Sequence, residues 1–174
     1  MKKLICGSFK KIIKEKEKLE NILKVKITNR GKEIYISGNA EDEYVAEKVI
    51  DAIEFGFPFS LAILLKVEDY VFEVLNLKDY TKRKDFKVIR SRIIGTKGKT
   101  IKNLDLLTKC YIKLKGNLIG ILGDPEYIKT AQTALISLIH GSKQANVYSY
   151  LEKHQPVDIF DFGLKKQKKP KPKK

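Results

Sequence analysis

One stretch of the chain occurs twice, and this repeat limits the fold more than any other feature. Residues 34–56, IYISGNAEDEYVAEKVIDAIEFG, align without a gap with residues 119–141, IGILGDPEYIKTAQTALISLIHG, at an offset of 85 residues. Further upstream, LICGSFKK (residues 4–11) aligns with RIIGTKGK (residues 92–99) at an offset of 88. Because self-similarity at a fixed spacing indicates a duplicated structural unit, the sequence predicts two copies of one small fold.

The second copy has patterns that predict its secondary structure. DFKVIRSR (85–92) is a candidate short strand, and KTIKNLDLLTK (99–109) spaces its apolar residues as a helix does. CYIKLK and NLIGIL are apolar runs separated by Gly116-Asn117, which predicts two strands joined by a tight turn. Asp124-Pro125 then predicts the start of a helix that ends at Gly141. With a short helix expected between residues 85–92 and 99–109, the order is β-α-α-β-β-α, an α+β unit with helices on one face of an antiparallel sheet.

The remaining segments predict a connector, a closing helix and a tail. Residues 57–81 are too apolar for a flexible linker, so we expect a short helix after Pro58 and a strand around Val71 to Leu75, packed so that both units form one rigid body. SKQANVYSYLEK (142–153) predicts a last docked helix. From Lys165 onward the chain has seven lysines, two prolines and no acid, a composition typical of disorder. The predicted divisions are residues 1–56, 57–81, 82–155 and 156–174.

The excess positive charge, +15 for the whole chain, is confined to the second half. Residues 1–81 carry 14 basic and 14 acidic residues, residues 82–155 carry 15 and 5, and residues 156–174 carry 7 and 2. A general surplus of solubilising lysine would appear in both halves. One region of single-sign charge instead indicates a polyanionic partner.

The cysteines and histidines lack the spacing typical of catalysis or metal binding. Cys6 and Cys110 lie far apart with no His or Cys at ligand spacing, so we expect two reduced core thiols and neither a disulfide nor a zinc site. His140 and His154 are isolated. No run approaches 18 apolar residues. We therefore expect a cytoplasmic protein that has no membrane segment, cofactor or metal and is not an enzyme.

The nine residues RIIGTKGKT (92–100) have the pattern of a loop that holds phosphate. Gly95 and Gly98 permit backbone angles that other residues avoid, and they leave room for a sugar-phosphate chain to approach the amides. The following helix would point free N–H groups at the same place, while Lys97, Lys99 and Lys102 add full charges. The loop lacks the Walker and dinucleotide-binding patterns, which argues against a nucleotide-binding enzyme.

The second copy, RIIGTKGKTIKNLDLLTKCYIKLKGNLIGILGDPEYIKTAQTALISLI, resembles a KH domain of the eukaryotic type (type I), whose signature is a G-x-x-G loop between two helices. The tandem arrangement, with EDYVFEVLNLKDY before this loop and ILGDPE and VYSYLEK after it, resembles the Krr/Pno (Dim) family of archaeal and eukaryotic small-subunit ribosome assembly factors over residues 1–155. The implied fold is two type I KH domains, each a three-stranded antiparallel sheet with helices on one face.

The resemblance implies a clamp for single-stranded RNA. In KH domains the G-x-x-G loop holds the backbone of about four nucleotides. Here the groove would be lined by isoleucines on the helical side, and by Ile112 and Leu114 or their alternates Tyr111 and Lys113 on the strand side. The candidate RNA-binding residues are Arg92, Ile93, Ile94, Gly95, Thr96, Lys97, Gly98, Lys99, Thr100, Ile101, Lys102, Ile112 and Leu114.

The first copy departs from this pattern. At the aligned place it has Gly7-Ser8-Phe9-Lys10, in which lysine replaces the second glycine. A Cβ there restricts the turn and crowds a phosphate, so we expect a degenerate KH unit that serves as a scaffold or contacts proteins. Lys109 is a second departure, because the family usually has a turn glycine before the second strand.

The family implies a monomeric RNA-binding protein of small-subunit biogenesis. By resemblance, its target is the 3′ region of small-subunit rRNA, and its partners are a Nob-type endonuclease and the alpha subunit of initiation factor two. The alternative RNA-binding role is a general KH protein of messenger-RNA or exosome pathways. The alternative of another class is the nucleotide-binding enzyme.

Overall fold

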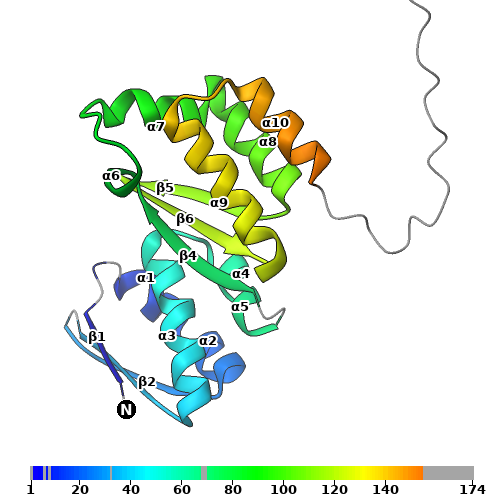
Figure 1. The fold of residues 1–174 in the computed structure, drawn as a ribbon. Coiled ribbons are helices and arrows are strands. Elements are labelled where there is room, and N and C mark those ends of the chain that lie inside the picture. The colour runs from blue at the N-terminus through cyan, green and yellow to red at the C-terminus, as the bar shows by residue number, and fades with distance from the viewer. Residues whose placement is uncertain (1, 6, 8, 32, 68–69, 155–174) are drawn as a thin grey trace, which may run out of the picture.

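The computed structural model describes residues 2–5, 7, 9–31, 33–67 and 70–154. Over these residues the chain forms two three-stranded antiparallel sheets, each with helices packed on one face (Figure 1). The first unit consists of β1 (Lys2–Ile5), α1 (Phe9–Lys14), α2 (Lys16–Leu23), β2 (Lys26–Arg30), β3 (Glu33–Ser37) and α3 (Ala40–Phe55). Two short helices, α4 (Phe59–Ala62) and α5 (Leu64–Val67), then lead to the second unit.

The second unit repeats this order, with the short helix α6 added after its first strand and α10 added at its end. It consists of β4 (Val71–Asn76), α6 (Leu77–Tyr80), α7 (Phe86–Ile94), the 3-10 turn η1 (Thr96–Gly98), α8 (Lys99–Thr108), β5 (Tyr111–Lys115), β6 (Leu118–Gly123), α9 (Pro125–His140) and α10 (Gln144–Lys153). The predicted helix after Pro58, the strand near Val71 and the closing helix are confirmed. The predicted tail from Lys165 lies outside the described residues.

One secondary-structure prediction is wrong. Residues 85–92 were expected to form a strand, but they lie in α7, because Ile89 and Ile93 are four residues apart and both face the core. The strand that pairs with β6 on the side away from β5 is β4, with Val71 opposite Gly123 and Asn76 opposite Leu118. The segment predicted as a connector therefore supplies the first strand of the second sheet.

The duplication is visible in the strand register. The strand orders are β1-β3-β2 and β4-β6-β5, so the last strand of each unit is central in both sheets. Ile27 pairs with Ile36 in the first sheet, and Ile112 pairs with Ile121 in the second, at the same offset of 85 residues. The departure at Lys109 also recurs: Lys24 and Lys109 both cap a helix in the left-handed conformation, with φ of 55° and 54°.

The upstream alignment at an offset of 88 residues does not correspond to equivalent positions in the fold. Gly95 to Gly98 lie between α7 and α8, whereas Gly7 lies between β1 and α1, where its N–H donates to Glu54 Oε1 at 2.8 Å. The equivalent junction of the first unit, between α1 and α2, is the single residue Glu15. The expected degenerate loop at residues 7–10 is therefore wrong, and the true counterpart contains no glycine.

Each unit buries its own apolar core between its sheet and its helices. Ile34 and Ile36 of β3 and Ile119 and Ile121 of β6 have no exposed surface, because alternate residues of a strand face the helices. Burying one such side chain contributes about 1.5–3 kcal/mol relative to leaving it exposed. Among the described residues, no helix is long and apolar enough to cross a membrane.

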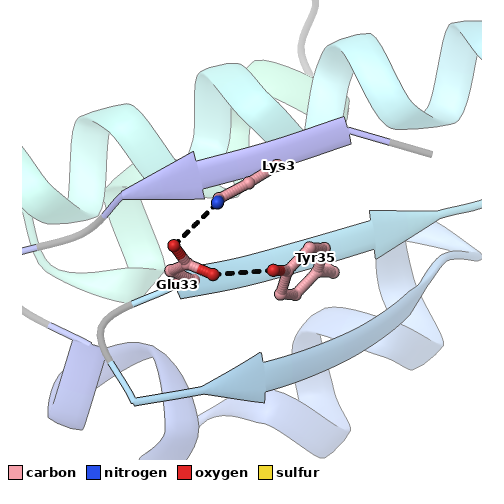
Figure 2. Close-up of polar contacts among 3 residues, drawn as sticks. All are labelled: Lys3, Glu33 and Tyr35. Carbon is pink, nitrogen blue, oxygen red and sulfur yellow. Dashed lines mark hydrogen bonds and ion pairs between the residues drawn. The ribbon is translucent and has the colours of Figure 1, made fainter.

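The other face of the first sheet is open and polar. Figure 2 shows Lys3 of β1 joined to Glu33 of β3, with Nζ 2.7 Å from Oε1, while the Tyr35 hydroxyl donates to Glu33 Oε2 at 2.7 Å. The hydrogen bond to Lys3 lowers the pKa of the Glu33 carboxyl, and the same contact raises the pKa of Lys3. This polar face suits contact with water.

The corresponding face of the second sheet is covered by the first unit. At the offset of 85, Gly120 stands where the first sheet has Tyr35, and a Cβ on it would lie 2.6 Å from Phe55 Cε1. Phe55, Phe57 and Phe72 form a ring cluster with centroids 5.7–6.0 Å apart. The absence of a side chain at Gly120 thus lets the end of α3 pack directly on the second sheet.

Candidate nucleic-acid interface

The loop between α7 and α8 depends on its two glycines for different reasons. Gly95 has φ 73° and ψ 175°, a region accessible essentially only to glycine, and a Cβ there would lie 2.0 Å from Thr100 Oγ1. Gly98 has φ 74° and ψ 16°, and the nearest atom to a Cβ there would be Ile101 Cγ2, 4.0 Å away. Gly95 therefore allows the loop to pack against the protein, whereas Gly98 leaves its outer side open.

Three side chains hold the loop from beneath. Thr100 is 3% exposed, and its Oγ1 accepts a hydrogen bond from Gln144 Nε2 at 2.9 Å. The same amide donates to the Arg92 carbonyl at 3.1 Å. Arg92 Nη2 donates to the carbonyls of Gly141 and Ser142 at 3.0 and 2.9 Å. Thr100, predicted to contact RNA, therefore faces the protein interior, while Arg92 is partly exposed and ties the end of α7 to the junction of α9 and α10.

Sequence reasoning missed Gln144. Gln144 lies at the start of α10, after the repeated unit has ended, and is part of no recognisable motif. It contacts the loop only because α10 packs on α8, a contact between segments distant in sequence. The only signal was the proximity of the predicted closing helix to the repeat.

The predicted groove residues divide into exposed and buried groups. Ile94 is 40% exposed beside the loop and Ile101 is partly buried, so both are accessible, whereas Ile93 is fully buried and belongs to the core. On β5, Ile112 and Leu114 pack against the helical core, while Tyr111 and Lys113 lie on the opposite face. Ile112, which is buried, and Leu114, which is partly buried, thus lie on the same side of the sheet as the helices, whereas Tyr111 and Lys113 do not.

Positive charge surrounds the open side of the loop. Lys97, Lys99 and Lys102 are exposed, and Lys97 has φ 53°, which turns the chain between the glycines. The first turn of α8 contains no acid, so its free N–H groups and the three ammonium groups together favour an anion. Thr96 is exposed at the same edge. The arrangement can hold phosphate oxygens without a metal ion.

Two titratable groups lie behind this surface. Burial raises the pKa of the Asp105 carboxyl to about 6, although Asp105 Oδ1 accepts a hydrogen bond from the Ile112 N–H at 3.0 Å. Burial also raises the pKa of the Cys110 thiol to about 12, which confirms a buried thiol at this position. Cys6 lies outside the described residues. In the described part of the chain, no group of three or more His, Cys, Asp or Glu side chains could hold a metal.

The fold matches that of known KH proteins. Residues 71–156 match the model of the second KH domain of Pno1 proteins, described as a eukaryotic type KH-domain (KH-domain type I). The crystal structure of Dim2p from Pyrococcus horikoshii superposes with a TM-score of 0.78 and 28% identity, covering 87% of this chain and 98% of that one. The chain belongs to the Pno/Dim family of KH proteins.

Two further relatives agree with this family. The KH domain-containing protein MJ0443 of Methanocaldococcus jannaschii is 30% identical over 125 residues, which are 71% of this chain and 55% of that protein. The chain thus spans about half the length of this curated relative. A Pyrococcus horikoshii complex described as a/eIF2alpha-aDim2p-rRNA matches with a TM-score of 0.79 and 27% identity, covering 88% of this chain and 93% of that one.

Proposed function

We propose that this Pno/Dim protein binds single-stranded RNA with the loop from Gly95 to Gly98. The supporting observation is the loop itself, which is packed on Thr100 on one side and open at Gly98 on the other, with exposed lysines at the start of α8. Type I KH domains hold about four backbone nucleotides at this loop. Ile94, Ile101, Ile112 and Leu114 would then border the bases.

We propose that the RNA is the 3′ region of the small-subunit rRNA precursor and that the protein acts in ribosome biogenesis in the cytoplasm. The related Dim2p forms a complex with rRNA and a/eIF2alpha, which supports an rRNA target and a contact with the alpha subunit of initiation factor two. A contact with a Nob-type endonuclease and a monomeric state rest on the family resemblance alone.

We also propose that the first unit is a KH domain without a working clamp. Its sheet order matches that of the second unit, but the junction of α1 and α2 is the single residue Glu15, so the unit has no glycine loop that a sugar-phosphate chain could approach. The second KH domain would begin at β4, where the family match also begins.

Gly98→Asp tests the clamp. Asparagine and aspartate tolerate left-handed angles better than other residues, and a Cβ at Gly98 has room, so the fold should remain stable. The new carboxylate faces phosphate, so most affinity for single-stranded RNA should be lost, as measured by fluorescence anisotropy. Lys10→Glu, on α1 of the first unit, introduces a negative charge away from the loop and should weaken binding much less. Wild-type affinity in Gly98→Asp would refute the clamp.

The target is tested by crosslinking the protein to RNA in its own cells and sequencing the bound fragments. Fragments concentrated near the mature 3′ end of small-subunit rRNA would support the ribosomal role. Fragments spread over messengers would instead support a general KH protein.

A further inference from the structure

A basic hollow lies where the two units meet. It has a volume of about 460 Å³, and its lining includes Lys11 and Lys14 of α1, Phe59 of α4 and Lys113 of β5. Figure 1 shows α1 and α4 of the first unit beside the second sheet. This hollow is separate from the loop at Gly95, and nothing in the proposed clamp uses it.

A hollow beside the clamp occupies the equivalent place in the second unit. That hollow, of about 410 Å³, is lined by the outer side of α7, by Gly95 and Thr96, and by Gln144. Gln144 corresponds to Phe59 at the offset of 85 residues. In the second unit this position holds the loop through hydrogen bonds, whereas in the first unit it presents an aromatic ring to the hollow. The two hollows therefore share this position and differ in the side chain that it contributes.

The lining of the junction hollow favours an anion. Lys11 and Lys14 are exposed and three residues apart, so they lie on the same side of α1, and neither has an ion-pair partner among the residues that the structure describes. One acid, Glu15, also lines the hollow, but its Oε2 lies 2.8 Å from Lys18 Nζ. Lys113 Nζ donates to the Gly56 carbonyl at the end of α3. Among the described residues, the hollow therefore has two lysines, Lys11 and Lys14, without an ion-pair partner.

Phe59 adds a surface for a base. Its ring is partly exposed, and Lys18 Nζ lies 5.9 Å from the ring centroid. Lysines that follow a phosphate backbone together with an aromatic ring on which a base stacks are the usual components of a single-strand binding site. An apolar peptide would use the ring but would gain little from the two lysines.

The hollow adjoins the proposed RNA groove across one strand. β5 is an edge strand of its sheet, and its residues alternate between the two faces. Ile112 and Leu114 face the groove side, while Lys113 between them lines the hollow together with Lys11 and Lys14 of α1. An RNA strand that leaves the groove across this edge therefore reaches these lysines.

We propose that the junction hollow binds the part of the RNA strand that continues beyond the nucleotides held at the Gly95 to Gly98 loop. Lys11 and Lys14 contact its phosphates, and Phe59 stacks on a base. This proposal rests on the proposed RNA clamp. It gives the first unit a direct role in RNA binding, although the unit has no glycine loop.

The test compares a short and a long single-stranded RNA on the full chain by fluorescence anisotropy over a range of salt concentrations. An oligomer of about four nucleotides reads the loop alone, and one of about twelve nucleotides reaches the hollow. In Lys11→Gln/Lys14→Gln, we expect the long RNA to lose about tenfold in affinity near physiological salt, and the salt slope to fall by about 1.4, because each phosphate contact contributes about 0.7. The short RNA should bind as it does to the wild type.

Lys10→Gln is the matched control, because Lys10 is an exposed lysine of the same helix that does not line the hollow. Its long-RNA affinity should stay within about twofold of wild type, the size expected for an exposed charge without a direct contact. Equal losses in the control and the double variant would show a general field and overturn the proposal, as would an unchanged long-RNA affinity in the double variant. Gly98→Asp should remove binding of the short RNA if the loop is the clamp. The clamp proposal is therefore tested by the short RNA, and the hollow proposal by the long RNA.

Discussion

Replacing Gly95 or Gly98 by alanine adds the same methyl group at either end of the loop, but we expect very different costs. At Gly95 the new Cβ would lie 2.0 Å from Thr100 Oγ1, 2.6 Å from Thr100 Cβ and 2.8 Å from the Thr100 backbone nitrogen. Rotation of the threonine side chain relieves only the first contact. The loop or the start of α8 must therefore move, and the hydrogen bond from Gln144 to Thr100 is lost with that movement.

The expected magnitude follows from three contributions. A non-glycine residue in the backbone region of Gly95 costs about 1–3 kcal/mol, forcing a methyl group into a packed site costs about 1–3 kcal/mol, and the lost hydrogen bond costs about 1 kcal/mol. Because one movement relieves part of the first two, we expect Gly95→Ala to lower the free energy of unfolding by about 3–5 kcal/mol. Gly98→Ala meets no atom closer than 4.0 Å and should cost only about 1 kcal/mol for its left-handed backbone.

Urea and thermal unfolding of the two variants measure this difference. At about 2–4 °C per kcal/mol, Gly95→Ala should lower the Tm by about 10 °C and Gly98→Ala by about 3 °C. Gly95→Ala/Thr100→Ala should recover little, because Thr100 Cβ and the backbone nitrogen remain. Equal losses in the two single variants would refute the claim that Gly95 packs the loop against Thr100.

Two further predictions concern the packing behind the loop. The pKa of Asp105 is raised from 3.8 to about 6, so its contribution to stability is present below about pH 4 and is lost as the pH rises through about 6. Asp105→Asn keeps an acceptor for the Ile112 N–H, so by urea unfolding it should be more stable than the wild type at pH 8 but not at pH 4. A stability difference that is the same at both pH values would contradict the assignment. Gly120→Ala should lower the free energy of unfolding by about 1–3 kcal/mol and increase protease cleavage between the units, because the new Cβ would lie 2.6 Å from Phe55. Wild-type stability in this variant would show that the first unit does not pack on the second sheet at Gly120.

The sequence alone determined the features that depend on local pattern. The offset of 85 residues predicted the second half of each unit, from the hairpin to the capped helix, because apolar spacing, Gly116-Asn117 and Asp124-Pro125 act over a few residues. The resemblance to KH domains placed Gly95 and Gly98 between two helices, and the local pattern identified the lysines around them. At Lys109 the sequence showed only a departure from the family's usual glycine, and the structure showed that the lysine adopts the left-handed conformation.

Only the tertiary structure decided which segments meet. The segment 85–92 is short, and its apolar positions suit either a strand or a helix. It could be assigned to a helix only once β4 was seen to be the strand beside β6. The counterpart of the loop in the first unit lies at Glu15 and not at residues 7–10, because equivalence is set by position between α1 and α2 and not by a shared glycine. Arg92, Thr100 and Gln144 support the loop through contacts between distant segments, which no local pattern encodes.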